Sequence, residues 1–356
     1  QKVTYEPGIA VPLEKGEHRT AVRPIGPGHP CFIVAEVGAN HNRSLNLAKE
    51  LVDAAAEAKA DAVKFQIYSA ETLYSRKTPK HSNYAKDLFE LIREIETPRE
   101  WLPELSAYAA SKGLVFFATP FDRQAVDELD QVSDLFKIAS FELVDLPLIR
   151  YCASKGKPLI LSTGLANLEE IEDAYLACRE AGNEQVAFLQ CASLYPAPAS
   201  IMNLRAMETL RRAFRVPVGL SDHTRGIHVS VAAAALGARI LEKHFTLDRT
   251  LEGPDHPFAI EPQELTELVR QVREVEAALG DGRKLGPAPE EREYYEKARR
   301  SLHAAVPIPR GTVIAEDMLV SKRPGYGIRP KHLPLVVGRT AKQDMEADQW
   351  ITWEMV

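Results

Sequence analysis

Short apolar runs recur along the chain, and each ends in polar residues that precede a segment with helical periodicity. Such runs are typical of strands buried on both faces of a sheet. We predict eight of them, at residues 31–37, 62–66, 114–119, 135–140, 158–163, 186–191, 216–221 and 239–244. Strands that alternate with helices indicate a parallel α/β sheet. Eight units over about 250 residues fit a (β/α)8 TIM barrel better than an open doubly wound sheet, and no GxGxxG follows the first strand.

The apolar pattern changes at both ends of this barrel. Residues 1–30 are rich in Pro and Gly and are expected to form an N-terminal extension, for which a hairpin is one arrangement. A Gly- and Pro-rich run follows the last barrel helix, and charged helical sequence comes after it. Short β-like runs then appear at 301–306, 312–314, 319–320 and 350–353. We therefore expect a barrel domain over 1–285, a linker over 286–297 and a small β-rich domain over 298–356.

Bulk composition narrows the classes of function. The chain of 356 residues has 45% hydrophobic and 26% charged residues, with a net charge of −6. This balance argues against a generic nucleic-acid binder, and no apolar run approaches the roughly 20 residues of a membrane span. The four cysteines show no CxxC spacing, which fits a reducing, cytoplasmic environment.

Polar residues gather at the predicted strand ends, where the side chains of a parallel barrel face the reaction chamber. His223 and His244 follow consecutive strands, which lie about 5 Å apart, so their imidazoles could share one divalent metal ion. The alternative is two separate core or capping histidines. His41 and Asn42 follow the first strand and either line the same chamber or serve as N-cap and turn residues.

Two lysines lie inside otherwise apolar strands, where a buried ammonium needs a partner. An anionic ligand bound between Lys64 and Lys137 is one explanation, and an internal ion pair such as Lys64 with Glu36 is the other. Hydroxyl groups at neighbouring strand ends are common donors to phosphate or carboxylate; they belong to Thr119, Ser140 and Ser162. The residues alone thus indicate a metal-assisted barrel enzyme that acts on a small phosphorylated or carboxylated substrate.

A series of short motifs makes the chain more recognisable. They are AEVGANHN (35–42), KFQ (64–66), TPF (119–121), KIAS (137–140), LSTG (161–164), YP (195–196), LSDHT (220–224), EKHF (242–245) and GPDH (253–256). Together they resemble the sialic acid synthase family, the phosphoenolpyruvate-dependent synthases of nonulosonic acids. The run SKRPGYGI (321–328) resembles the C-terminal antifreeze-like (SAF) domain of that family.

This resemblance implies a condensation of phosphoenolpyruvate with an open-chain N-acylated hexosamine, with C–O cleavage and release of phosphate. It implies a divalent metal on His223 and His244, most often manganese, with magnesium and cobalt as alternatives. It also implies a homodimer in which the SAF domain of one subunit caps the barrel of the other. The roles it assigns are phosphoenolpyruvate binding for Lys64, Thr119, Lys137, Ser140, Ser162 and Ser221, catalysis for Glu36, Glu242, Lys64 and Lys137, and sugar binding for Tyr195, Asp255 and Arg323.

The sequence indicates the subtype of synthase less clearly than it indicates the family. Residues 136–149 look most like those of pseudaminic acid synthases, which we rank first. Ser193 departs from the Asn usual in N-acetylneuraminate synthases, and GPDH is shared with legionaminic-type enzymes and spore-coat polysaccharide relatives. Two rivals remain: a synthase of 3-deoxy-ulosonic acid phosphates, and, from another class, a catalytically inactive carbohydrate-binding protein.

Overall fold

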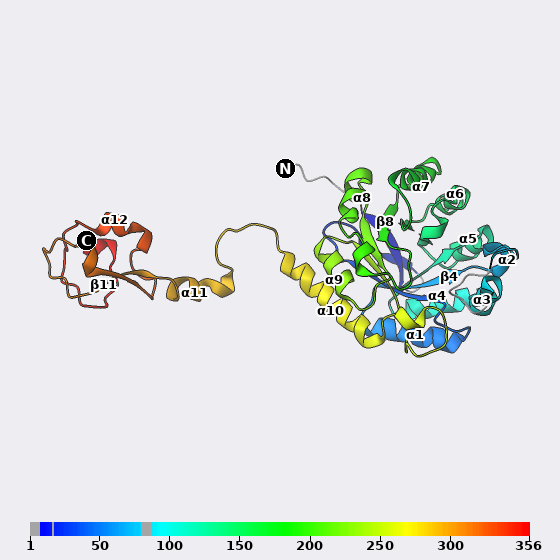
Figure 1. Cartoon of the computed structure of the whole chain (residues 1–356), viewed down its shortest axis with the longest axis horizontal. Helices are drawn as coiled ribbons and strands as arrows, with labels where there is room; N and C mark the ends of the chain where they lie inside the picture. The colour runs from blue at the N-terminus through cyan, green and yellow to red at the C-terminus, as the bar shows by residue number, and fades with distance from the viewer. Residues whose placement is uncertain (1–7, 16–17, 80–86) are drawn as a thin grey trace. The chain divides into compact units, whose positions relative to one another are not determined.

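The computed structural model describes residues 8–15, 18–79 and 87–356, and the chain divides into two compact units, Gln1–Gly280 and Asp281–Val356. The first unit is built on a closed barrel of parallel strands in the order β10-β3-β4-β5-β6-β7-β8-β9, shown in Figure 1. Its strands are β3 Phe32–Gly38, β4 Ala62–Ile67, β5 Val115–Pro120, β6 Phe136–Ile138, β7 Leu159–Ser162, β8 Val186–Cys191, β9 Val218–Asp222 and β10 Ile240–His244. The predicted TIM barrel is confirmed.

Helices follow the strands and cover the outside of the barrel. Several begin at residues whose side chains accept a backbone N–H of the first turn: Ser44 caps α1, Asp122 caps α5, and Asn167 forms a capping box with Glu170 at the start of α7. The helices of this unit are α1 Leu45–Glu57, α2 Ala70–Leu73, α3 Leu88–Ile95, α4 Leu102–Ser111, α5 Arg123–Asp130, α6 Leu146–Ala153, α7 Leu168–Glu180, α8 Ala206–Phe214, α9 His228–Ala235 and α10 Pro262–Leu279.

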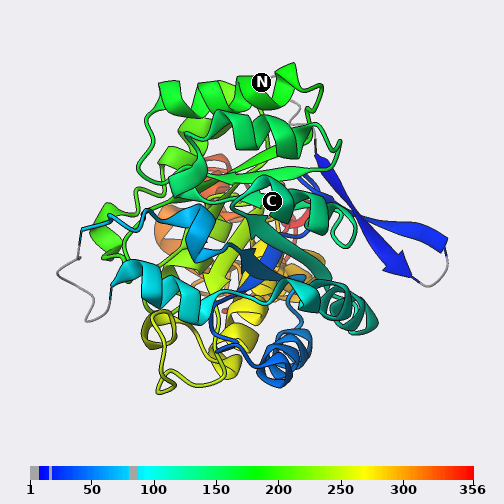
Figure 2. The same cartoon turned by 90° about the vertical axis from the view of Figure 1, so that its right-hand side faces the viewer.

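A hairpin closes the N-terminal end of the barrel. Strands β1 (Ile9–Lys15) and β2 (His18–Ile25) pair in antiparallel fashion, which agrees with the expected N-terminal extension. Ile9, Val11 and Ile25 belong to one buried cluster with side chains of the barrel interior, and the dark blue hairpin of Figure 2 projects from the barrel beyond this contact. Apolar side chains therefore fill this end of the barrel, and its polar side chains concentrate at the opposite end.

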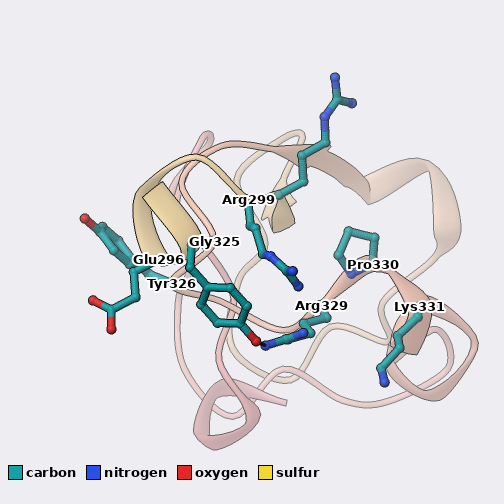
Figure 3. Close-up of a pocket in the computed structure, with 9 residues that line it drawn as sticks. Glu296, Arg299, Gly325, Tyr326, Arg329, Pro330 and Lys331 are labelled. Carbon is teal, nitrogen blue, oxygen red and sulfur yellow. Dashed lines mark hydrogen bonds between the residues drawn. The ribbon is translucent and has the colours of Figure 1, made fainter. Parts of the chain in front are cut away.

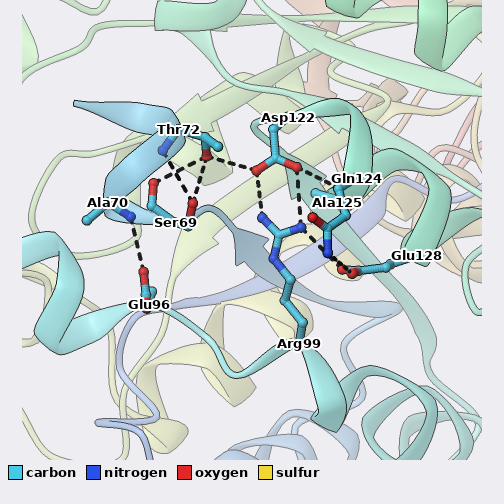
Figure 4. A network of polar contacts seen from close by, with 9 residues as sticks. All are labelled: Ser69, Ala70, Thr72, Glu96, Arg99, Asp122, Gln124, Ala125 and Glu128. Carbon is cyan, nitrogen blue, oxygen red and sulfur yellow. Dashed lines mark hydrogen bonds and ion pairs between the residues drawn. The ribbon is translucent and has the colours of Figure 1, made fainter. Parts of the chain in front are cut away.

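A polar network ties residues 69–72 and 96–99 to each other and to the loop after β5 (Figure 4). Arg99 Nη2 donates to Asp122 Oδ2 at 2.6 Å, and the Thr72 hydroxyl donates to the same oxygen at 2.9 Å. The backbone N–H of Ala70 donates to Glu96 Oε2 at 3.1 Å. These bonds join the loop after β4 to the loop after β5, beside the strand ends that carry the candidate site.

The second unit has a small core of its own. Strands β11 (Ser301–Ala304) and β12 (Leu319–Lys322) pair in antiparallel fashion, and the buried cluster behind them is Leu302, Ala304, Ile308, Ile314, Ile328, Val336, Ala341, Met345, Ile351 and Val356. The prediction of strands at 312–314 and 350–353 is wrong, because Val313 and Trp350 form only isolated bridges. Helix α11 (Arg292–Lys297) occupies part of the stretch expected to be a linker, and α12 spans Leu333–Val336.

Among the residues that the structure describes, no helix is long and apolar enough to span a bilayer.

Candidate active site at the C-terminal end of the barrel

A buried group of alternating charges lies at the ends of strands β3, β4 and β10. The strand register pairs Glu36 with Lys64, and Lys64 Nζ lies 2.8 Å from Glu36 Oε2 and 3.6 Å from Glu242 Oε1. Lys64 also donates to Thr119 Oγ1 at 3.3 Å. Burial by itself lowers the pKa of Lys64, but Glu242 and Glu36 outweigh it and the pKa is raised. The internal ion pair considered for Lys64 is therefore present.

Lys137 differs from Lys64 in its hydrogen-bond partners. Its ammonium is 2% exposed and donates to Ser162 Oγ at 2.7 Å and to the carbonyl of Ile138 at 2.8 Å. The carboxylate of Glu242 lies 4.0 Å away, beyond hydrogen-bond distance. Burial dominates and lowers the pKa of Lys137, although Glu242 raises it in part. Since an ammonium has three donors, one of them has no hydrogen-bond acceptor among the residues that the structure describes.

Hydroxyl groups surround Lys137 and the charged group. Ser140 Oγ accepts the backbone N–H of Gly164 at 3.0 Å, and Ser221 Oγ donates to Glu242 Oε1 at 3.4 Å. A Cβ atom at position 164 would lie 2.7 Å from Ser140 Oγ and 2.3 Å from Ser193 Oγ. Gly164 therefore leaves room for two hydroxyls to approach one backbone segment beside the Lys137–Ser162 pair.

His223 and His244 lie together at the ends of β9 and β10, as predicted. Their ring centroids are 5.3 Å apart. The Nδ1 atom of His223 is 2.8 Å from the carbonyl of Ala192, an arrangement in which Nδ1 carries the proton, and its Nε2 lies 3.4 Å from Ser221 Oγ. The Nδ1 of His244 lies 3.5 Å from Asp255 Oδ2. Burial by itself lowers the pKa of His244, but Asp255 outweighs it and the pKa is raised.

The predicted sugar-binding residues fall in two places. The ring of Tyr195 contacts that of His223 with a centroid distance of 4.1 Å and a tilt of 35°, and Tyr195 is 45% exposed. Asp255 joins it in the chamber through its contact with His244. Arg323 belongs to the second unit and is exposed.

The ion pair between Asp222 and Lys243 lies in the barrel wall behind the two histidines. These residues face each other in the strand register, and Lys243 Nζ is 3.1 Å from Asp222 Oδ2, with both side chains buried. Asp222 also accepts hydrogen bonds from Thr224 and Ser230. Because neighbouring positions on a strand point to opposite faces, this pair anchors the wall while Glu242 and His244 face the chamber.

Comparison with known proteins places this geometry in a family. Residues 51–284 match the family described as "NeuB family", and residues 299–356 match the family described as "SAF domain". The chain belongs to the NeuB family. The expected resemblance is thereby confirmed for both parts of the chain.

Named relatives cover nearly the whole length of this NeuB-family chain. The N,N'-diacetyllegionaminic acid synthase of Campylobacter jejuni is 40% identical over 90% of this chain and 98% of the relative. A pseudaminic acid synthase of the same species is 36% identical over 88% and 93%. The crystal structure of an N-acetylneuraminic acid synthetase from Leptospira borgpetersenii matches with a TM-score of 0.71 and 36% identity, over 81% of this chain and 96% of that one. The homologues are thus nonulosonic acid synthases of several subtypes.

The structure adds site residues that the sequence did not single out. Gln66 Nε2 donates to Glu36 Oε1 at 2.6 Å, and its spacing of two from Lys64 was a usable signal because alternate strand residues share a face. Glu142 follows β6 in a short 3-10 turn, Ser140–Glu142, and burial raises its pKa to about 7. No periodicity marks that turn, so a buried carboxyl there could not be predicted from the sequence.

His41 and Asn42 stabilise the loop after β3. His41 Nε2 lies 2.8 Å from Thr97 Oγ1, and its Nδ1 accepts the backbone N–H of Arg43. Asn42 Oδ1 accepts a hydrogen bond from His256 Nε2 at 3.0 Å. These contacts fix the loop after β3 to its neighbours, so both residues support the chamber from outside.

Proposed function

We propose that this chain condenses phosphoenolpyruvate with an open-chain N-acylated hexosamine, with C–O cleavage and release of phosphate. The observation that carries this proposal is Lys137, a buried ammonium with one donor to spare and hydroxyls on either side. A buried donor without a hydrogen-bond acceptor is costly, and a phosphate or carboxylate supplies that acceptor. The names of the relatives support the same reaction class.

The residues around Lys137 have separate roles in this proposal. We assign phosphoenolpyruvate to the hydroxyl and ammonium groups of Lys64, Thr119, Lys137, Ser140, Ser162 and Ser221. Glu36 and Glu242 lie within 4 Å of Lys64 and are placed to hold or move protons at the reacting carbons. Tyr195 and Asp255 stand at the histidine side of the chamber, where the sugar aldehyde would approach.

A divalent metal fits the two histidines. The Ala192 carbonyl holds His223 Nδ1, so Nε2 is the nitrogen available to a metal, with the Ser221 hydroxyl 3.4 Å from it. His244 is buried beside it, with Asp255 3.5 Å from its Nδ1. In that part of the chain, no cluster of three or more His, Cys, Asp or Glu side chains has metal-binding geometry, so substrate and water would complete the shell. Manganese is our first candidate, with magnesium and cobalt next, and such an ion supplies Lewis-acid polarisation of an aldehyde oxygen.

An inactive carbohydrate-binding protein is the rival from another class. A binding protein has no need of buried, alternating carboxylates and ammoniums, which cost desolvation energy. The two are separated by measuring phosphate release from phosphoenolpyruvate with a panel of N-acyl hexosamines. We expect sugar-dependent release with at least one unphosphorylated sugar. Release only with phosphorylated, non-acylated sugars would indicate the 3-deoxy-ulosonic acid phosphate rival, and no release with any sugar would support the binding protein.

The subtype is tested by the same panel. The sequence around Phe136 and Glu142 favours a pseudaminic-type sugar, whereas the named legionaminic and pseudaminic relatives match at 40% and 36% identity. We propose the pseudaminic-type diacetamido sugar as the first substrate to assay, followed by its legionaminic stereoisomer and N-acetylmannosamine. A turnover preference for either of the latter two would replace the pseudaminic assignment.

We further propose a homodimer in which the second unit of one subunit caps the barrel of the other. The loops at the barrel mouth expose apolar side chains that a lone barrel would leave in water; these are Phe141, Val144, Leu165, Leu194 and Tyr195. In this arrangement Arg323 contributes a charged donor to the sugar site of the partner subunit.

Replacing Arg323 with Ala should raise KM for the sugar while the dimer and phosphoenolpyruvate binding stay unchanged. The reason is that Arg323 is exposed and lies outside the core of its unit. Mixing this variant with His223→Ala should restore activity, because one mouth of each heterodimer combines an intact barrel with an intact cap. A monomer by light scattering, or no recovery after verified subunit exchange, would contradict the cap in trans.

A further inference from the structure

The second unit carries a cationic pocket on its own surface (Figure 3). Its volume is about 620 Å³, and four of its lining residues are cationic: Arg299, Arg300, Arg329 and Lys331. Glu296 is the one acidic residue of the lining, and Figure 3 shows its carboxylate directed away from Arg299, Arg329 and Lys331. The pocket therefore presents several positive charges to one space.

The wall of this pocket is set by close backbone packing. The N–H of Gly325 donates to the carbonyl of Glu296 at 3.2 Å. A Cβ atom at position 325 would lie 3.0 Å from that carbonyl and from Arg299 Cβ, and one at position 327 would lie 2.5 Å from the carbonyl of Ile351. Gly325 thus allows the loop after β12 to press against the end of α11, and Gly327 allows the same loop to approach Ile351. Arg299 and Arg329 consequently reach the same ring, that of Tyr295.

Two guanidinium groups share one aromatic ring in this pocket. Arg299 Cζ lies 4.0 Å from the ring centroid of Tyr295, and Arg329 Cζ lies 5.5 Å from it. Arg329 Nη2 also donates to the Tyr295 hydroxyl at 2.6 Å, a bond that lowers the pKa of Tyr295. Like charges gathered on one ring repel each other, and an anion placed between them would remove that cost.

The cations of this pocket differ from other cations of the second unit in their ion pairs. Elsewhere in the second unit, Lys297 pairs with Glu293 at 2.6 Å and Lys322 pairs with Asp348. Within the described residues, no carboxylate forms a salt bridge with Arg299, Arg329 or Lys331. A planar guanidinium pair matches the geometry of a phosphoryl group, which it can bind through paired N–H donors.

We propose that this pocket binds the phosphoryl group of a small phosphorylated molecule between Arg299 and Arg329. Lys331 adds a third positive charge from the η7 turn, Pro330–His332. The inference stands apart from the reaction proposed for the barrel, because none of the residues involved belongs to the first unit. Inorganic phosphate, pyrophosphate and phosphoenolpyruvate share the required chemistry, and the experiment separates them.

Tryptophan fluorescence offers a readout confined to the second unit. The chain has three tryptophans, and Trp350 contacts the pocket residue Tyr326 with a centroid distance of 5.6 Å. In the full chain carrying Trp101→Phe, the signal comes from Trp350 and Trp353 alone. Titration with each of the three anions should give a saturable change in tryptophan fluorescence. The anion that binds most tightly identifies the class of molecule whose phosphoryl group the pocket binds.

The double variant Arg299→Gln, Arg329→Gln should weaken that binding at least tenfold. The matched control is Arg310→Gln, which removes an exposed arginine from another face of the same unit. Binding should persist in Lys137→Met, which shows that the barrel site is not the one observed. Equal thermal unfolding of all variants confirms that the second unit is folded.

Three outcomes would overturn the proposal. One is a fluorescence change that occurs with every anion, including sulfate, and that chloride at physiological concentration abolishes. Another is unchanged binding in the Arg299→Gln, Arg329→Gln variant. The third is a change of subunit association in that variant, seen by light scattering, while its anion binding stays intact; it would assign these cations to a contact between subunits.

Discussion

Replacing Lys137 with Met should weaken phosphoenolpyruvate binding by about 2–5 kcal/mol, which corresponds to a loss of more than tenfold in affinity. Met keeps the length of the apolar stem and removes the charge. The lost interaction is large because Lys137 is buried and holds its position through Ser162 and the Ile138 carbonyl rather than through a carboxylate at bonding distance. Calorimetric titration with phosphoenolpyruvate measures the effect directly.

A matched control for this change is Lys157→Met. Lys157 pairs with Asp130 at 2.9 Å and precedes β7, at the opposite end of that strand from Ser162. We expect it to lower the unfolding temperature modestly and to leave phosphoenolpyruvate affinity unchanged. Equal affinities in Lys137→Met and Lys157→Met would show that Lys137 serves the barrel structure alone.

Replacing His223 with Ala should abolish turnover and most of the affinity for manganese while the barrel stays folded. Changes to residues that merely orient a ligand cost about 10–100-fold in metal affinity, so the loss of a direct imidazole ligand should cost more. The measurements are manganese binding by calorimetry and phosphate release after chelation and metal addition. We expect chelation to abolish activity in the unmodified chain, and manganese, cobalt or magnesium to restore part of it.

The control for His223→Ala is His228→Ala, an exposed histidine at the start of α9. It should bind manganese and turn over substrate as the unmodified chain does. Full activity of His223→Ala, or of the unmodified chain in excess chelator, would remove the metal from the proposed reaction.

The barrel was predictable because its strands are buried on both faces and therefore appear as continuous apolar runs. The polar strand ends followed from the same pattern, since Glu36 and His244 lie at or near the ends of such runs. The sequence left the contacts of Lys64 open between an anionic ligand and an ion pair with Glu36, and gave no means to choose between them. The ion pair of Lys64 and the open donor of Lys137 differ because the strand register sets Glu36 opposite Lys64, and no spacing in the sequence reveals that register.

The second unit was harder to predict for a physical reason. Its chain makes single bridges, as at Val313 and Trp350, where the sequence favoured strands. Short β-prone runs do not pair over several residues when turns interrupt them, so propensity alone overstates the extent of the sheet. Glu142 escaped notice for a similar reason, because a turn outside the periodic elements carries it.

The alternating charges of Glu36, Lys64, Glu242 and Lys137 have a thermodynamic consequence for the order of events in the chamber. Two carboxylates and two ammoniums sum to zero, so this group of four exerts little long-range attraction on an anion. A multiply charged anion that enters leaves an excess of negative charge in a low-dielectric space. Positive charge must enter with it, as a proton on one carboxylate or as a divalent cation at the histidines. The affinities for phosphoenolpyruvate and for the cation are therefore coupled, and by reciprocity each ligand should tighten the binding of the other.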